Sequence, residues 1–194
     1  MATNSESGNT VLRVWLLLHR VRDILFLCED SVFKDYGLTT EQFTLLAAVK
    51  GGGSLRPSDL AFYMERSPNS VSMLVDRMVQ AGLVKRTRDR KDRRVVNVTL
   101  TGKGEKAVER AAPAGWALVQ KVLSPVSDKD KRALASILET VKCECLGYLN
   151  PGVDMAGIIK DSVTRRSDLY EEWNRTFPSG SQVKSHGGKK GKAK

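Results

Sequence analysis

The chain has 194 residues, of which 41% are hydrophobic, and it carries a formal net charge of +10 at neutral pH. This apolar content is enough for a folded core, and the positive charge favours a polyanionic partner. Three cysteines and two distant histidines exclude a disulfide scaffold and a zinc site of ordinary spacing, so no metal or other cofactor is expected.

The first predicted helix, residues 11–33, follows a polar segment, residues 1–10, that we expect to be flexible. Its most apolar part, Val11–Leu18, is too short to span a membrane, and the preceding residues lack the basic start of a secretory signal. A cytoplasmic location is therefore expected. The apolar residues of this helix exceed one face, so it must be buried on several sides, either in a core or against another subunit. For a domain this small we favour the subunit interface.

A second predicted helix begins after Thr39 or Thr40, either of which can cap it, and ends at the three glycines 51–53. A third, short helix starts at Pro57, because proline suits the first helical position, and runs to Met64.

The fourth predicted helix has clear ends: Ser67 can cap it, Pro68 fits its first turn, and Gly82 terminates it. Only two residues separate it from the third helix, which is the helix-turn-helix pattern. At about 100° per residue, the helix has one apolar and one polar side. The apolar side, which should pack on the third helix, holds Val71, Leu74, Val75, Met78 and Val79. The opposite side holds Asn69, Ser70, Met73, Arg77 and Gln80, with Ser72 and Asp76 at one margin.

Two β-type runs, residues 83–87 and 95–100, then flank a basic hairpin tip. Residues 85–94 contain seven basic and two acidic side chains. Their net charge of 7 − 2 = +5 is half of the net charge of the chain. A helix of this kind can fill the major groove of DNA while such a ribbon reaches phosphates or the minor groove. An ordinary solvated face is the alternative for the helix alone, and the adjacent ribbon favours DNA.

Two more helices are predicted, residues 105–122 and 128–149. Pro113-Ala114-Gly115 indicates a kink or a split in the first of them. The second has an apolar stripe that could pair with the first helix of the chain in a dimer. Beyond it we expect a C-terminal extension, residues 151–177, with candidate helices at 155–159 and 168–173. Residues 178–194 form a basic tail that should be disordered, either a loose arm or a solvated terminus.

Several motifs together resemble the MarR family of winged helix-turn-helix transcription regulators. They are Asp59-Leu60-Ala61, Ser70-Val71-Ser72, Leu74-Val75-Asp76-Arg77-Met78, Gly82-Leu83-Val84-Lys85-Arg86, Asp92-Arg93-Arg94 and Leu100-Thr101. The resemblance covers about residues 11–150. It implies a mainly α fold with a small β-hairpin wing, and N- and C-terminal dimerisation helices. It also implies a homodimer on a near-palindromic double-stranded DNA operator, with half-sites about one helical turn apart.

The resemblance also assigns residue roles. The matching positions for base reading are Ser67, Asn69, Ser70, Ser72, Met73 and Arg77, and the matching wing contacts are Arg90, Arg93 and Arg94. Met73 departs from the family pattern, where many members carry arginine, and it favours contact with a thymine methyl group. We expect Asp76 and Asp92 to pair with Arg77 or Arg94 rather than to touch DNA.

Family members often bind small phenolic or other aromatic effectors between their two lobes. The candidates to line such a cleft are Trp15, His19, Phe43 and Trp116, although each type is more often a core residue. The function expected is a repressor released by such an effector. The alternatives are a nonspecific architectural DNA-binding protein that uses the wing and tail, and a redox-sensing regulator acting through Cys28. No nucleophile–base set or phosphate-binding glycine loop is present, so an enzyme is not expected.

Overall fold

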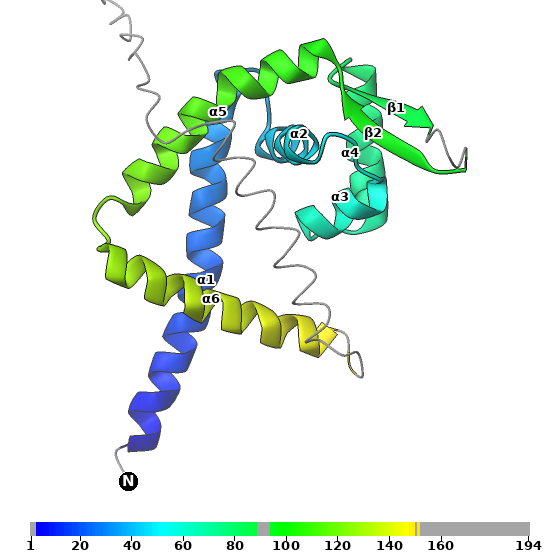
Figure 1. Cartoon of the computed structure of the whole chain (residues 1–194). Coiled ribbons are helices and arrows are strands. Elements are labelled where there is room, and N and C mark those ends of the chain that lie inside the picture. Colours follow the sequence, from blue (N-terminus) through cyan, green and yellow to red (C-terminus); the bar gives the residue numbers. More distant parts are fainter. Residues whose placement is uncertain (1–2, 89–93, 150, 152–194) are drawn as a thin grey trace, which may run out of the picture. The chain divides into compact units, whose positions relative to one another are not determined.

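The computed structural model of the chain describes residues 3–88, 94–149 and 151. These residues divide into two compact units that meet in the sequence between Ala111 and Ala112. In chain order the elements are α1 (Thr3–Lys34), α2 (Thr40–Gly52), α3 (Pro57–Met64), α4 (Pro68–Gln80), β1 (Val84–Arg88), β2 (Val96–Leu100), α5 (Gly102–Leu123) and α6 (Asp128–Leu149) (Figure 1). The mainly α fold with a small hairpin is confirmed. The predicted C-terminal extension and basic tail lie, apart from residue 151, outside the described residues.

Helix α1 differs from its predicted bounds, because it starts at Thr3 and not at residue 11. The flexibility expected for residues 1–10 stays a prediction, and the helix already includes the residues from Thr3 onward. Serine, asparagine and Gly8 are weak helix formers, which is why this segment looked like coil. Once the apolar part of the helix exists, however, each added turn forms its hydrogen bonds without a new nucleation step.

The helix-turn-helix, α3 and α4, is held by local hydrogen bonds at each junction. Glu65 takes a left-handed conformation with φ 52°, and the Arg66 N–H donates to the Ala61 carbonyl at 3.0 Å, which reverses the chain sharply. Ser67 caps α4 by accepting from the Ser70 N–H at 3.2 Å, as predicted.

The end of α4 is a Schellman motif built on Gly82, which has φ 69°. The Leu83 N–H donates to the Met78 carbonyl at 2.9 Å and the Gly82 N–H donates to the Val79 carbonyl at 2.9 Å. The chain leaves this turn directly into β1, so the position of the wing follows from the end of α4.

The two strands of the wing pair antiparallel, from Val84 opposite Leu100 to Arg88 opposite Val96. Leu55, in the loop before α3, adds a single bridge to β2 through two hydrogen bonds with Val98. That bridge was not predicted, because one isolated residue has no strand periodicity.

The core of the first unit gathers around α2. Its fully buried side chains include Leu45, Leu46, Leu60, Val71, Val75, Met78, Val84, Val98 and Val108. Helix α5 approaches this core at Gly104, where an added Cβ would lie 2.0 Å from the Leu83 carbonyl oxygen. The lack of a side chain at position 104 therefore sets how closely α5 follows the wing.

Helix α5 runs without a break through Pro113, so the split predicted there does not occur. A proline removes one backbone hydrogen bond from a helix, and the remaining bonds on both sides can hold the helical path. The division between the two units falls one residue before this proline, between Ala111 and Ala112. In the second unit, α6 has no buried side chain among its residues. Among the described residues, no helix has the length and apolar content of a membrane span.

Candidate nucleic-acid interface

Helix α4 separates a buried face from an exposed face. Val71, Leu74, Val75 and Met78 are each at most 5% exposed and belong to the core. Val79 was expected to be buried with them, but its side chain is 37% exposed and lies at the edge of the buried face. The spacing i, i+3, i+4, i+7 of the four buried residues fixes the rotation of α4 about its axis.

The polar face of α4 points outward, as its sequence pattern predicted. Asn69, Met73 and Arg77 are exposed, and the Met73 side chain is 65% exposed, which is unusual for a large apolar residue. No packing role explains Met73, so its exposure fits contact with an apolar group outside the chain.

The serines of the predicted reading set are less free than the other members. The Ser67 and Ser70 hydroxyls lie 2.8 Å apart, and Ser67 also caps the helix. Ser72 is half-buried. A contact from Ser67 or Ser70 to a base would have to share these hydrogen bonds.

Asp76 pairs with an arginine, but the partner differs from the one predicted. Its carboxylate lies 2.5 Å from the Arg86 guanidinium on β1, and not against Arg77. Sequence spacing alone suggested the neighbour in the helix, whereas the turn at Gly82 brings β1 back alongside α4. The pair links α4 to β1.

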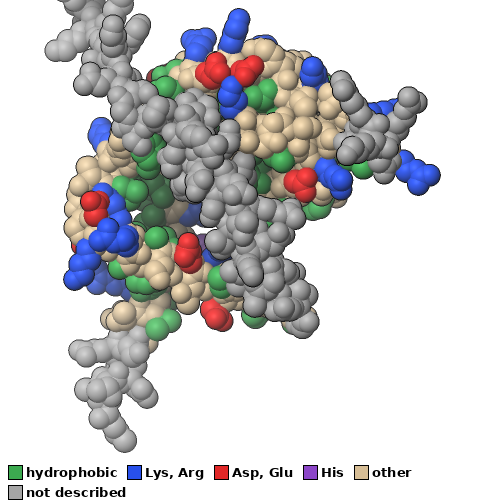
Figure 2. Space-filling model, in the orientation of Figure 1, with side chains coloured by type: hydrophobic (Ala, Val, Ile, Leu, Met, Phe, Trp, Pro, Cys, Tyr) green, Lys and Arg blue, Asp and Glu red, His purple; other side chains and the backbone are tan. Residues whose placement is uncertain are grey.

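The wing carries exposed basic side chains on β1 and just before β2. Lys85, Arg86 and Arg88 on β1 are exposed, and so is Arg94, just before β2. Figure 2 shows Lys and Arg side chains beside the tip of the hairpin. Two of the three predicted wing contacts, Arg90 and Arg93, lie outside the described residues, as does Asp92.

The residues predicted to line an effector cleft are not gathered within the first unit. Trp15 and His19 touch edge to face on α1, with ring centroids 5.0 Å apart. Phe43 is a core residue that stacks on Phe33 at 3.9 Å. Phe33 is 18 residues beyond Trp15 on the same helix, which is about 27 Å at the α-helical rise. Trp116 belongs to the second unit, where its indole nitrogen is buried without a hydrogen-bond partner.

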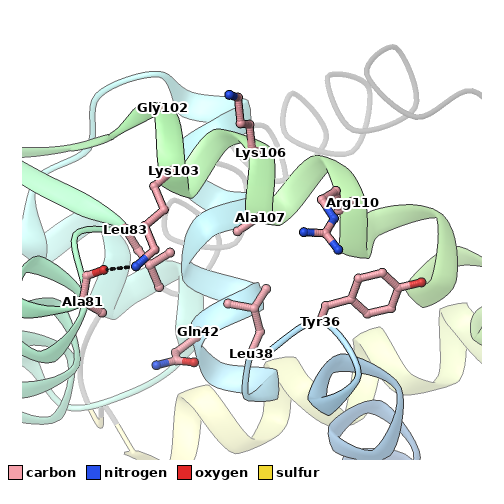
Figure 3. A pocket seen from close by; sticks show the side chains of 11 residues that line it. Tyr36, Leu38, Gln42, Ala81, Leu83, Gly102, Lys103, Lys106, Ala107 and Arg110 are labelled. Atoms are coloured by element: carbon pink, nitrogen blue, oxygen red, sulfur yellow. Dashed lines mark hydrogen bonds between the residues drawn. The ribbon is translucent and has the colours of Figure 1, made fainter.

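The first unit does contain a cleft, of about 600 Å³, at a place that sequence reasoning missed (Figure 3). It lies between the α1–α2 loop, the end of α4 and the first turns of α5. Its charged lining comes from Lys103, Lys106 and Arg110. Their spacing places all three on one face of a helix, and that regularity was the signal available in the sequence.

Among the described residues of the first unit, two ionisable groups have displaced pKa values. Hydrogen bonds to the Glu105 and Glu109 carboxylates, 2.5 and 2.9 Å away, raise the pKa of Lys50. Burial raises the pKa of the Glu29 carboxyl. Glu29 lies on α1 and Lys50 on α2, so neither group belongs to the exposed face of α4.

The three cysteines are free thiols: Cys28 and Cys143 are half-buried and Cys145 is exposed. Among the described residues, no group of three or more histidine, cysteine or acidic side chains is placed to hold a metal ion.

Comparison with known proteins relates this arrangement to transcription regulators. A sequence model of the MarR family matches residues 36–95. The transcriptional repressor MdtR of Bacillus subtilis is 35% identical over 101 residues, which are 52% of this chain and 65% of MdtR. The transcriptional regulator BilQ of Clostridium symbiosum is 30% identical over 118 residues, 60% of this chain and 81% of BilQ.

A solved structure agrees with these sequence matches. AbsC, a MarR family transcriptional regulator from Streptomyces coelicolor, superimposes with a TM-score of 0.67 at 26% identity. The superposition covers 71% of this chain and 95% of AbsC.

Proposed function

The chain belongs to the MarR family of DNA-binding transcription regulators, and we propose that it is a homodimeric repressor of a near-palindromic operator, released by a small effector. The observation that carries the proposal is the division of α4 into a fully buried apolar face and an exposed face bearing Asn69, Met73 and Arg77. A helix held from one side presents its other side to a major groove.

The exposed face offers chemistry for reading bases. Arginine can bond guanine bidentately, asparagine can do the same to adenine, and an apolar side chain can contact the methyl group of thymine. Arg77, Asn69 and Met73 supply one of each. The basic side chains of the wing supply the phosphate contacts that place the helix without reading sequence.

A second copy of the chain is the natural partner for α1. This helix exposes Trp15, Leu16, Ile24 and Leu27 to more than half of their full extent, and α6 buries none of its own side chains. Water-exposed apolar area of this extent is unfavourable for a lone protomer and marks an interaction surface. A two-fold dimer would set two copies of α4 one helical turn of DNA apart, which predicts the operator symmetry.

Selection of bound sequences from random double-stranded DNA tests the proposal. We expect an enriched inverted repeat whose half-site centres are separated by roughly 10 base pairs. Binding to the enriched site should survive an excess of random DNA. An architectural binder would give no enriched motif and would be removed by that excess, which would contradict the proposal.

The wing and the helix can be tested separately on the enriched site. Arg94→Ala should weaken binding to all sequences and reduce the salt-dependence slope by about one, because one phosphate contact is lost. Arg77→Ala should instead relax the preference at one base pair, at a loss of about 1–3 kcal/mol. Normal binding by Arg94→Ala across a salt series would show that Arg94 is no wing contact.

A further inference from the structure

Two methionines of α4 lie on opposite sides of the helix. Met78 is fully buried in the core, whereas the Met73 side chain is 65% exposed. At about 100° per residue, the five positions between them turn the helix by roughly 140° beyond one full turn. Since Val71, Leu74 and Val75 are buried together with Met78, this rotation is fixed. Met73 is therefore an apolar group exposed to solvent on the face of α4 that the proposed function directs toward DNA.

The polar groups about one turn from Met73 on either side are already engaged within the chain. Three positions before it, the Ser70 hydroxyl lies 2.8 Å from the Ser67 hydroxyl. Three positions after it, the Asp76 carboxylate is bound by the Arg86 guanidinium on β1. This ion pair neutralises the single acid in the sequence of α4. A group that packs on Met73 therefore does not have to bury an unpaired carboxylate beside it.

Met73 also lies midway between two hydrogen-bonding side chains of the exposed face. Asn69 and Arg77 are four positions before and after it, which is about 6 Å along the helix on each side. Side chains four residues apart share one face of a helix. Because base pairs follow one another at about 3.4 Å, the three side chains reach different base pairs of one groove.

A methionine in the major groove has one matching group on the bases. Its thioether is apolar and at most a weak hydrogen-bond acceptor, so it distinguishes poorly between the O4 acceptor of thymine and the N4 donor of cytosine. The group that it can bury is the C5-methyl group of thymine. The same ring carbon bears a methyl group in 5-methylcytosine but only a hydrogen in uracil and in cytosine. Met73 is therefore suited to select the methyl group rather than the base.

We propose that Met73 makes operator binding depend on a C5-methyl group at one pyrimidine of each half-site, so that 5-methylcytosine can replace thymine there. Where an operator carries cytosine at this position, methylation of that cytosine strengthens binding. The inference rests on the proposed function, because it needs the exposed face of α4 to lie in a major groove. It adds a chemical mark on the DNA to which the regulator responds.

Replacement of thymine by uracil in the selected operator tests the methyl contact, because it removes only the methyl group. Each thymine is replaced together with its symmetry-related thymine, and affinity is measured by fluorescence anisotropy at fixed salt. At one such pair we expect a loss of about tenfold or more, since burial of one methyl-sized group is worth about fourfold and the dimer buries two. Met73→Ala should bind the thymine and uracil forms of this operator equally.

Methylated cytosine tests the response to the mark. The thymines of the same pair are replaced by cytosines, and the operator is compared with and without a C5-methyl group on both. Methylation should strengthen binding by about tenfold, for the same reason as before. Met73→Ala should gain nothing from the methyl groups, which is the control for an effect of methylation on the DNA alone.

Further variants show whether the apolar surface of Met73 is the cause. Met73→Leu keeps an apolar side chain and should retain part of the preference for the methyl group. Met73→Gln should lose it, because glutamine seeks hydrogen bonds to adenine instead. Met78→Leu is the matched control on the buried face, where a swap of similar volume is tolerated, and it should leave the preference unchanged.

Equal affinity for thymine and uracil at every position of the half-sites would overturn the proposal. A methyl preference that Met73→Ala leaves unchanged would do the same, and methylated cytosine that binds no better than cytosine would overturn the response to methylation. In each of these cases the enriched inverted repeat remains, so the proposed function stands. A chain that enriches no motif contradicts the proposed function and this inference with it.

Discussion

Helices α4 and α1 use apolar residues in opposite ways. In α4 the apolar side chains Val71, Leu74, Val75 and Met78 recur at helical spacing and are buried within the same chain, which leaves an exposed face on the other side of the helix. In α1 apolar side chains surround the helix, and eleven of them are exposed by 38–68%. A single protomer buries the apolar face of α4. The apolar side chains of α1 can be buried only against another surface. The two helices therefore differ in whether one protomer is enough to bury them.

The largest expected effect tests the buried face of α4. Leu74→Ala should lower the free energy of unfolding by about 2–5 kcal/mol, because a fully packed side chain is replaced by a cavity. Met73→Ala, on the adjacent exposed face, should change it by less than about 0.5 kcal/mol. Urea titrations of both variants give the comparison, and a similar loss from both would mean that the two faces of α4 are not distinct.

The next effect tests whether α1 needs a second copy. Ile24→Glu places a charge on its apolar surface and should weaken dimer association by about 2 kcal/mol or more, since a charge would be buried without a partner. Asn9→Glu, at an exposed polar position of the same helix, is the control. Sedimentation equilibrium measures both, and an unchanged association constant for Ile24→Glu would remove α1 from the interface.

A smaller effect concerns the link between α4 and the wing. The Asp76 and Arg86 side chains are 51% and 38% exposed, so their pairing should contribute only about 0.2–1 kcal/mol to stability. A double-mutant cycle with Asp76→Asn and Arg86→Gln measures this coupling. A coupling energy of zero would mean that the turn at Gly82 alone positions the wing.

The smallest effect depends on pH and concerns the ion pairs that link α2 to α5. The pKa of Lys50 is raised above its ordinary value of 10.5 by Glu105 and Glu109. The stabilisation is therefore fully present below pH 10.5 and is lost as the pH rises through the higher pKa of the folded state. Its size should be less than about 1 kcal/mol, because both carboxylates are half-exposed.

Lys50→Met is the variant that isolates this contribution. The difference in unfolding free energy between the two proteins should shrink as the pH rises above 10.5. A difference that stays constant with pH would show that the ion pairs contribute nothing and that only the packing of the Lys50 stem matters.

Local patterns were sufficient for the helix-turn-helix. The cap at Ser67, the stop at Gly82 and the faces of α4 depend on residues within a few positions of one another, and such short-range chemistry is readable in sequence. The same holds for both strands of the wing. The start of α1 was missed because helix extension through weak formers depends on the helix that follows, not on the residues themselves.

Contacts between distant segments were decided by the tertiary structure. The partner of Asp76 was misassigned because the Gly82 turn brings Arg86, ten residues away, closer than the neighbour Arg77. Phe43 looked like a cleft residue until its stacking on Phe33 placed it in the core. The cleft beside Arg110 was not foreseen either, because three separate segments have to meet before it exists.

The sequence by itself therefore determined the type of each element, the two faces of α4 and the basic wing, since these follow from periodicity and capping. Only the tertiary structure decided which charges pair, which aromatic rings are core, and where the cleft lined by Lys103 and Arg110 forms. Those relations depend on close packing between parts of the chain far apart in sequence, and no local pattern encodes such distances.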